Sequence, residues 1–333
     1  MKQKAYLFLF LVIFFSCQSE PIEYQSVRGV AFGTTYSITY ENIPNKDYTI
    51  AIDSLINVMN QSLSTYVPDS QISKINDGAS TFKVDSYFEE VFIKSNRIYE
   101  ETEGIFDPTI GTLVNAWGFG PEKALNNISD TQVDSMMQYV GFDKVTLNNG
   151  VIVKSNPNIY FDFNAIAKGF GIDIIGRFLE REGISNYLIE LGGEIRAKGT
   201  NEKGEFWRVA IEDPNTDGSR SYSKIVTLEN VAMATSGNYR KFNIDNNGRK
   251  FVHTVNALTG YAEESDLLSA TVVAPLDCAD VDGYATAFMA MGLTKTKDFL
   301  GNHPTIEAHL IYANEAGELQ SFTTSRLKVM AVD

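Results

Sequence analysis

Asp162-Phe-Asn-Ala-Ile-Ala-Lys-Gly-Phe-Gly-Ile-Asp173 stands between an apolar run typical of a strand and a run with the spacing of a helix. The stretch brings a carboxylate, a lysine and two glycines to that junction. Backbone N–H groups and a lysine at a helix start favour a phosphate, and a nearby carboxylate can hold a sugar hydroxyl, a ring N–H or a metal ion. The stretch therefore predicts a site for a phosphate ester or a nucleotide.

Lys168 has two interpretations within this stretch. Its charge lies near the expected helix start and opposes the helix dipole there, at a small local cost. A bound anion would explain that position. A surface lysine that stands near a helix start explains it about equally well, so Lys168 alone does not decide.

The composition limits the class of partner. The chain has 333 residues, enough to bury a substantial core in one large domain or in two. It carries 28 Lys and Arg against 42 Asp and Glu, a formal net charge of −14. Nucleic acid needs a basic surface, so this charge argues against it as a partner. A small anion held locally by amides and one lysine is compatible with the charge.

The N-terminus has the pattern of an export signal. Two lysines precede the apolar run 5–15, which is short for a membrane span, and a small residue and Cys17 follow. This order is similar to a bacterial lipoprotein signal. We expect residues 1–17 to be the signal peptide that ends at a lipidated Cys17, and 18–27 to be a tether. An ordinary cleaved signal with an incidental cysteine is the alternative.

This N-terminus also predicts where the protein acts. We expect export and a lipid anchor in the bacterial membrane, on the periplasmic face of the inner membrane. Cys278 is then the only other cysteine, so no disulfide can form within the chain and the core must stabilise it.

The remaining residues, 28–333, mix the patterns of strands and helices. We expect an α+β fold with mixed or antiparallel sheets and packed helices, as one catalytic domain of one or two lobes. The expected helices are 48–63, 87–101, 131–139, 166–179 and 279–291, the last capped near Gly292. The expected strands are 26–40 with a bulge near Gly33, 159–163, 187–191, 207–212, 224–234, 251–255, 269–273 and 308–312, with a hairpin over 144–153 and a loop over 114–120.

Asp282 and Thr286 are four residues apart in the last expected helix, so they share one face. Together they can offer two oxygens to Mg²⁺, which prefers few protein oxygens together with waters and substrate phosphates. A solvated Asp and a Thr bonded back to its own helix explain the same spacing, and spacing alone favours that explanation. Asp280 could replace Asp282 in either case.

Two further side chains are candidates on weaker grounds. His253 lies in a short strand-like run, where a single histidine is more often structural, although it could act as a base or orient a phosphate. Tyr66 lies in a loop, where it could stack on a flat ring or pack beneath the loop. The pair Gly192-Gly193 predicts only a turn, and the chain has no P-loop and no dinucleotide fingerprint.

Taken together, these segments resemble the ApbE family of flavin transferases. The resemblance runs from about Arg28 to Gly292, and its most specific motif is 162–173, in which Ala165-Ile-Ala-Lys168-Gly169 is intact. The other matching segments, in chain order, are 32–36, 63–66, 70–76, 104–108, 117–120, 191–195, 235–237, 253–260 and 282–292. Two departures are Phe32 in place of the family's Met and 256–258 in place of its usual Asp-Pro, which removes a rigid turn and one charge.

The resemblance implies the ApbE-like fold and a set of site residues. Asp282, Thr286 and the backbone carbonyl of Ala165 would hold Mg²⁺. The residues that would line the FAD site are Phe32, Tyr66, Ile105, Phe106, Asp107, Asp162, Lys168 and His253.

The resemblance also implies a reaction. A Thr or Ser hydroxyl of an acceptor protein would attack the FMN-side phosphorus of FAD, so that FMN is joined through a phosphoester and AMP leaves. We assign His253 as the hypothesised base and Asp282 as the catalytic metal ligand. The implied acceptors are exported domains of membrane redox complexes. The alternatives are an FAD pyrophosphatase, and a lipid-anchored flavin-binding protein without turnover.

Overall fold

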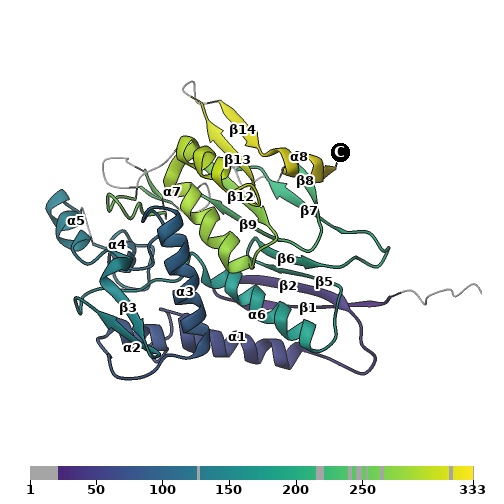
Figure 1. Cartoon of the computed structure of the whole chain (residues 1–333), viewed down its shortest axis with the longest axis horizontal. Helices are drawn as coiled ribbons and strands as arrows, with labels where there is room; N and C mark the ends of the chain where they lie inside the picture. Colours follow the sequence, from purple (N-terminus) through teal and green to yellow (C-terminus); the bar gives the residue numbers. More distant parts are fainter. Residues whose placement is uncertain are drawn as a thin grey trace, which may run out of the picture.

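The computed structural model describes residues 22–125, 128–214, 221–238, 242–244, 250–252, 254–262, 266–314 and 318–332. Its centre is an eight-stranded sheet in the order β1-β2-β5-β6-β9-β12-β13-β14, in which each neighbouring pair is antiparallel. Helices α1, α3, α6 and α7 lie over one face of this sheet (Figure 1). This arrangement confirms the predicted α+β class.

The helices are α1 (Thr49–Leu63), α2 (Gln71–Asn76), α3 (Ser86–Glu101), α4 (Gly111–Ala116), α5 (Asp130–Met137), α6 (Ala167–Arg181), α7 (Cys278–Asn302) and α8 (Ser325–Met330), with a 3₁₀ turn at Phe142–Lys144. The strands are β1 (Tyr24–Ala31), β2 (Thr34–Glu41), β3 (Val145–Asn148), β4 (Val151–Lys154), β5 (Tyr187–Leu191), β6 (Glu194–Lys198), β7 (Trp207–Glu212), β8 (Tyr222–Leu228), β9 (Ala232–Gly237), β10 (Phe242–Ile244), β11 (Lys250–Val252), β12 (Leu267–Ala274), β13 (Glu307–Ala313), β14 (Leu319–Thr323) and β15 (Ala331–Val332).

The central sheet is buried on both faces because side chains alternate along each strand. On β12, Val272 belongs to the large core under the helices, whereas its neighbour Val273 belongs to a second core. That second core lies against the three-stranded sheet β15-β8-β7 and includes Trp207 and Leu327. The helical layer and the small sheet therefore pack on opposite faces of the central sheet.

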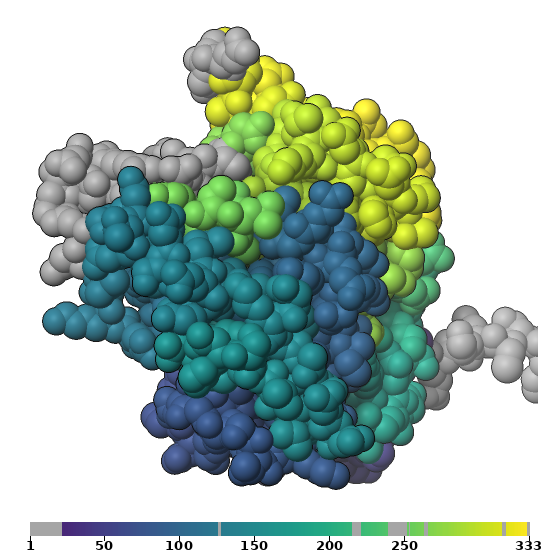
Figure 2. Space-filling view, turned by 60° about the vertical axis from the view of Figure 1, so that its left-hand side comes forward, coloured from purple at the N-terminus to yellow at the C-terminus, as the bar shows by residue number. Residues whose placement is uncertain are grey.

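Helix α7 is central to the layer that positions the site. It packs on β9 and β12, on α6, and on α3, and Figure 2 shows the blue α3 region directly against the yellow-green α7 region. Its first residues have their N–H groups satisfied by Asp173 of α6, which accepts from the amides of Cys278 and Ala279 at 2.9 Å each. A carboxylate at a helix N-terminus is favourable, so Asp173 fixes the start of α7 on α6.

The first expected strand is two strands joined by a turn. The expected strand 26–40 is a hairpin of β1 and β2, and the turn between them is Phe32-Gly33 with φ of 50° and 75°. Both turn residues have the left-handed conformation that two-residue hairpins favour. Strand β1 begins at Tyr24, so residues 24–27 of the expected tether belong to the sheet.

The expected strand 159–163 is wrong, because only Tyr160 forms a bridge, to Ile110. The side chain of Asn76 instead pairs with both backbone groups of Phe161, at 2.7 and 2.9 Å. The apolar run reflects burial of Phe161 and Phe163 in the aromatic core rather than pairing in a sheet.

Three other expected boundaries are corrected. The expected loop 114–120 begins within α4, and the expected strand 224–234 is divided between β8 and β9. Of the expected strand 251–255, residues 251 and 252 belong to β11, residues 254 and 255 are not in a strand, and residue 253 lies outside the described ranges. The break near Gly292 is confirmed as a non-helical residue with φ of 74°, but the helix resumes after it and continues to Asn302.

His309 links the central sheet to the three-stranded sheet β15-β8-β7. Its burial leads us to expect that stability depends on pH. Its Nε2 lies 2.9 Å from Ser223 Oγ on β8, and its Nδ1 lies 2.7 Å from Thr323 Oγ1 on β14. Burial, and Lys224 next, lower the pKa of His309 from 6.5 to about 4. The unfolded chain therefore binds a proton that the folded chain excludes, and His309 should cost about 1.4 kcal/mol of stability per pH unit as pH falls from 6.5 towards 4.

Urea unfolding at pH 7 and pH 5 measures this cost. We expect His309→Gln to lose less stability than the unchanged chain between the two values, because Gln keeps hydrogen-bonding groups but does not titrate. His303→Gln, at the end of α7, is the matched control. Equal losses in His309→Gln and the unchanged chain would contradict this role of His309.

Among the described residues, none of the helices combines the length and the apolar character that crossing a bilayer requires.

Candidate functional site

One large cavity brings the predicted site residues together. Its volume is about 1420 Å³, and it opens beside the starts of α6 and β6 and beside α7. Every predicted site residue that the structure describes lines this cavity, namely Phe32, Tyr66, Ile105, Phe106, Asp107, Asp162, Ala165, Lys168, Asp282 and Thr286. His253 lies outside the described residues, although its neighbour Thr254 lines the cavity.

The start of α6 is pressed closely against the start of α7. A Cβ added to Gly169 would lie 2.4 Å from the carbonyl oxygen of Cys278, so only glycine allows this approach. The approach lets the amide of Gly169 donate to Asp282 Oδ2 at 3.0 Å. Gly169 therefore allows the close contact between α6 and α7, and its amide donates a hydrogen bond to the carboxylate of Asp282.

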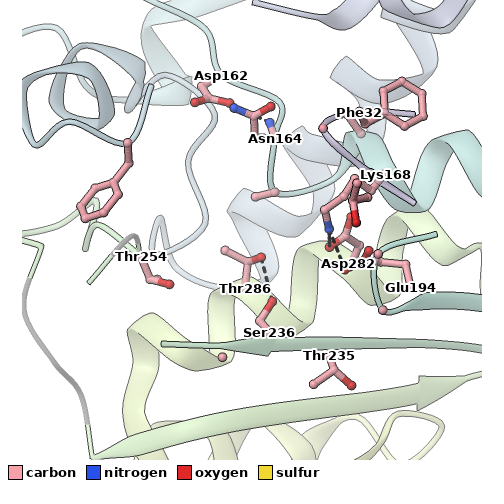
Figure 3. A pocket seen from close by; sticks show the side chains of 18 of the residues that line it. Phe32, Asp162, Asn164, Lys168, Glu194, Thr235, Ser236, Thr254, Asp282 and Thr286 are labelled. Atoms are coloured by element: carbon pink, nitrogen blue, oxygen red, sulfur yellow. Dashed lines mark hydrogen bonds and ion pairs between the residues drawn. The ribbon is translucent and has the colours of Figure 1, made fainter. Parts of the chain in front are cut away.

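Lys168 lies between two buried carboxylates, as Figure 3 shows. Its Nζ is 2.6 Å from Glu194 Oε1 on β6 and 3.7 Å from Asp282 Oδ1 on α7. Burial opposes the charge of Lys168, but Asp282 and Glu194 outweigh burial and hold the pKa of its ammonium above the usual value. The lysine is thus a fixed positive charge on the cavity wall, and 29% of its side chain is exposed.

Asp282 and Thr286 lie side by side on the cavity face of α7. Asp282 is 1% exposed, so the explanation of a solvated carboxylate is wrong. Thr286 Oγ1 lies 3.3 Å from Ser236 Oγ of β9 (Figure 3). The alternative Asp280 pairs with Lys94 and Arg97 on α3 and does not line the cavity.

Asp107 shapes the cavity wall through its own turn. Its Oδ1 accepts from both the amide and the hydroxyl of Thr109 at 2.7 Å, and its Oδ2 accepts from the amide of Phe142 at 3.1 Å. Burial raises the pKa of Asp107 to about 6, against these hydrogen bonds. Both of its oxygens have protein partners, so its side chain stabilises the loop that carries Ile105 and Phe106.

Both oxygens of Asp107 accept hydrogen bonds from the protein, whereas Asp162 accepts with Oδ1, so Asp162 has more capacity to bind a ligand. Its Oδ1 accepts from the amide of Asn164 at 2.7 Å, and both residues line the cavity. Burial raises the pKa of Asp162 above the usual value. The turn at Asp162 and Asn164 leads the chain from the aromatic core into α6.

Two aromatic side chains reach the cavity from separate turns. Phe32 lies in the turn between β1 and β2, and Tyr66 follows the end of α1. Tyr66 is 58% exposed and its hydroxyl donates to the carbonyl of Phe119 at 3.5 Å, so the alternative that Tyr66 packs beneath its loop is wrong. An exposed aromatic ring at the mouth of a cavity can stack on a planar ligand.

The departure at 256–258 keeps a turn. Asn256 accepts from the amide of Leu258 with its side chain at 2.9 Å, and its carbonyl accepts from the amide of Gly260 at 2.8 Å. Asn favours such turns because its short side chain bonds to the backbone two residues on.

Two features of the cavity, the buried carboxylate of Glu194 and the edge of β7, were not predicted from the sequence. Glu194 is 2% exposed and lies at the start of β6, directly after the predicted turn Gly192-Gly193. Val209, Ala210 and Ile211 of β7 all line the cavity although successive side chains point to opposite faces, so the edge of β7 borders it. The only signal for Glu194 was its place in the matched segment 191–195.

Comparison with known proteins agrees with this geometry. The ApbE family model matches residues 32–310. The FAD:protein FMN transferase of Haemophilus influenzae is 34% identical over 315 residues, covering 91% of this chain and 90% of that protein. The enzyme of the same description from Vibrio cholerae is 36% identical over 289 residues, 85% of each chain.

Solved structures give the same result. Flavin Transferase ApbE from Vibrio cholerae superposes with a TM-score of 0.83 at 32% identity, covering 93% of this chain and all of that chain. The apo flavinyl transferase ApbE of Pseudomonas stutzeri superposes with a TM-score of 0.82 at 25% identity, covering 93% of this chain and 97% of that chain. With the family model matching most of its length, this chain belongs to the ApbE family.

Proposed function

We propose that this protein transfers FMN from FAD to a Thr or Ser hydroxyl of an acceptor protein, in a Mg²⁺-dependent reaction that forms a phosphoester and releases AMP. Family membership and relatives described as FAD:protein FMN transferases support the transfer of FMN to protein. The observation that carries the finer proposal is the convergence of Asp282, Thr286 and Lys168 on one cavity with Asp162 and two aromatic side chains.

The described residues fit Mg²⁺. Asp282, Thr286 and the carbonyl of Ala165 would hold it, and all three residues line the cavity. Within the described ranges no three His, Cys, Asp or Glu side chains form a metal cluster. Mg²⁺ does not need such a cluster, because it takes few protein oxygens and keeps waters and substrate phosphates. When bound, the ion would neutralise charge that develops on the leaving phosphate.

The chain's own residues would do the remaining work. Lys168 would face the pyrophosphate of FAD, and Phe32 and Tyr66 would contact its flat rings. The acceptor hydroxyl forms a bond to the FMN-side phosphorus while the bond from that phosphorus to the bridging oxygen breaks, and AMP leaves with the electron pair. The hydroxyl proton would pass to His253, a base that typically contributes about 10²–10⁴ in rate.

Mass spectrometry of an acceptor tests this chemistry. A candidate exported domain of a membrane redox complex is incubated with the enzyme, FAD and Mg²⁺, then digested. The proposal expects one Thr or Ser peptide that gains the mass of FMN less one water and keeps it under denaturing conditions. A flavin that is removed by denaturation, or a mass that includes AMP, would contradict a phosphoester of FMN.

We also propose that the protein is exported and anchored to the membrane through lipidated Cys17, where it would meet exported acceptors. The pattern of residues 1–17 supports this. We expect Cys17→Ser to move the protein from the membrane fraction to the soluble fraction while its activity on FAD in detergent stays unchanged. Cys278→Ser is the matched control and should stay with the membranes. An equal distribution of Cys17→Ser and the unchanged protein would argue against the anchor.

A further inference from the structure

Glu194 has one oxygen engaged and one without a partner. Its Oε1 contacts Lys168 Nζ at 2.6 Å. Its Oε2 is buried and has no hydrogen-bond partner among the described residues, although Glu194 lines the cavity. An unpaired buried carboxylate oxygen is costly, so such an atom indicates a group that is bound there in the working protein.

The charges around Glu194 also indicate that a cation binds there. Glu194 and Asp282 are both almost fully buried, and both contact Lys168. Two buried carboxyl groups share a single ammonium at this corner of the cavity, so the described side chains supply fewer positive charges there than acidic groups. Buried charges need compensation, and a divalent cation beside Asp282 would supply it.

The backbone around Glu194 holds this residue in a fixed position at the cavity. Gly192 and Gly193 turn the chain with φ of 63° and 110° between β5 and β6, and the Gly193 amide donates to Glu190 Oε1 at 3.0 Å. Residue 194 then enters β6, opposite Leu191 in the register. The side chain therefore comes from a sheet whose position is fixed by pairing on both sides.

We propose that Glu194 is the second carboxylate of the cation site: Oε1 holds Lys168, and Oε2 accepts hydrogen bonds from waters on the Mg²⁺ that Asp282 and Thr286 hold. This inference rests on the proposed function for the presence of the cation. Mg²⁺ keeps several of its waters, and groups that bond to a metal's ligands orient them and tune its affinity. Glu194 thus positions both the lysine and the hydrated ion.

Calorimetric titration of the full protein with Mg²⁺ tests this without any turnover. The titration is run with Mg²⁺ alone and again with ADP present, whose diphosphate is a stable mimic of the pyrophosphate. We expect Glu194→Gln to bind Mg²⁺ about 10–100-fold more weakly than the unchanged protein. Glu202→Gln, which removes an exposed carboxylate in the loop after β6 and outside the cavity, is the matched control and should bind as the unchanged protein does.

The outcomes separate this inference from the proposed function. Equal Mg²⁺ affinity in Glu194→Gln and the unchanged protein would overturn the role of Glu194, and so would the absence of Mg²⁺ binding by the unchanged protein in both titrations. Mg²⁺ binding that depends on Glu194, in a protein that flavinylates no acceptor, would leave the role intact and overturn the proposed function. If Glu194→Gln does not fold in a thermal melt, Glu194→Asp takes its place, with an intermediate loss of affinity expected.

Discussion

Asp282→Asn is expected to slow flavin transfer by about a thousandfold at limiting Mg²⁺. The substitution keeps the size of the side chain and an oxygen that can accept from the Gly169 amide, but it removes the charge that would hold the ion. Metal assistance is worth several kcal/mol of transition-state stabilisation, and each 1.4 kcal/mol corresponds to about tenfold in rate. Initial rates of AMP release over a range of Mg²⁺ concentrations measure the effect.

The matched control lies on the same helix. Asp298 is exposed on the second half of α7, so Asp298→Asn should leave the rate and its Mg²⁺ dependence unchanged. If Asp282→Asn transfers flavin at the unchanged rate under limiting Mg²⁺, then Asp282 does not hold the ion. A thermal melt with both variants shows whether the loss of rate comes from the site or from unfolding.

Gly169→Ala is expected to destabilise the fold by roughly 3 kcal/mol, because the new methyl group overpacks the contact between α6 and α7. The added Cβ would lie 2.4–2.8 Å from three backbone atoms of Cys278 and Ala279, which cannot move as a side chain can. The helices must separate, and the hydrogen bond from Gly169 to Asp282 lengthens with them. Flavin transfer should therefore fall even at temperatures where the variant is folded.

Gly301→Ala is the control for adding a methyl group to a helix. Nothing lies within 4 Å of the Cβ it would add, so we expect no loss and a gain of up to about 1 kcal/mol from the less flexible unfolded chain. Urea unfolding at 25 °C compares the two variants. A Gly169→Ala protein as stable as Gly301→Ala would show that the helices do not need this close approach.

Local patterns predicted much of the fold because alternation and helical spacing report burial directly. β5 and β7 begin and end where the alternation of 187–191 and 207–212 placed them. The hairpin of β3 and β4 turns at Asn149 and Gly150, both with positive φ, as Asn-Gly predicts. The errors arose where tertiary structure overrode local preference: Phe32 has a positive φ that its residue type does not favour, and Phe161 pairs with a side chain.

For the site too, local sequence patterns predicted some residues, and others depend on tertiary contacts. The shared helix face put Asp282 and Thr286 together, but only the family resemblance assigned that pair to Mg²⁺. The motif with its family resemblance predicted Asp162 and Lys168. Glu194 could not be predicted from spacing, because it reaches Lys168 only through the pairing that sets β6 beside the start of α6.

The stretch 162–173 and α7 form one site for moving FMN from FAD to protein, and a product balance is the decisive experiment on that transfer. AMP, free FMN and protein-bound flavin are quantified over time in one reaction with FAD, Mg²⁺ and an acceptor. We expect one AMP for each protein-bound flavin and little free FMN, with none of these products forming when Mg²⁺ is chelated. AMP released one-for-one with free FMN, while the acceptor stays unmodified, would contradict this transfer and make the protein an FAD pyrophosphatase.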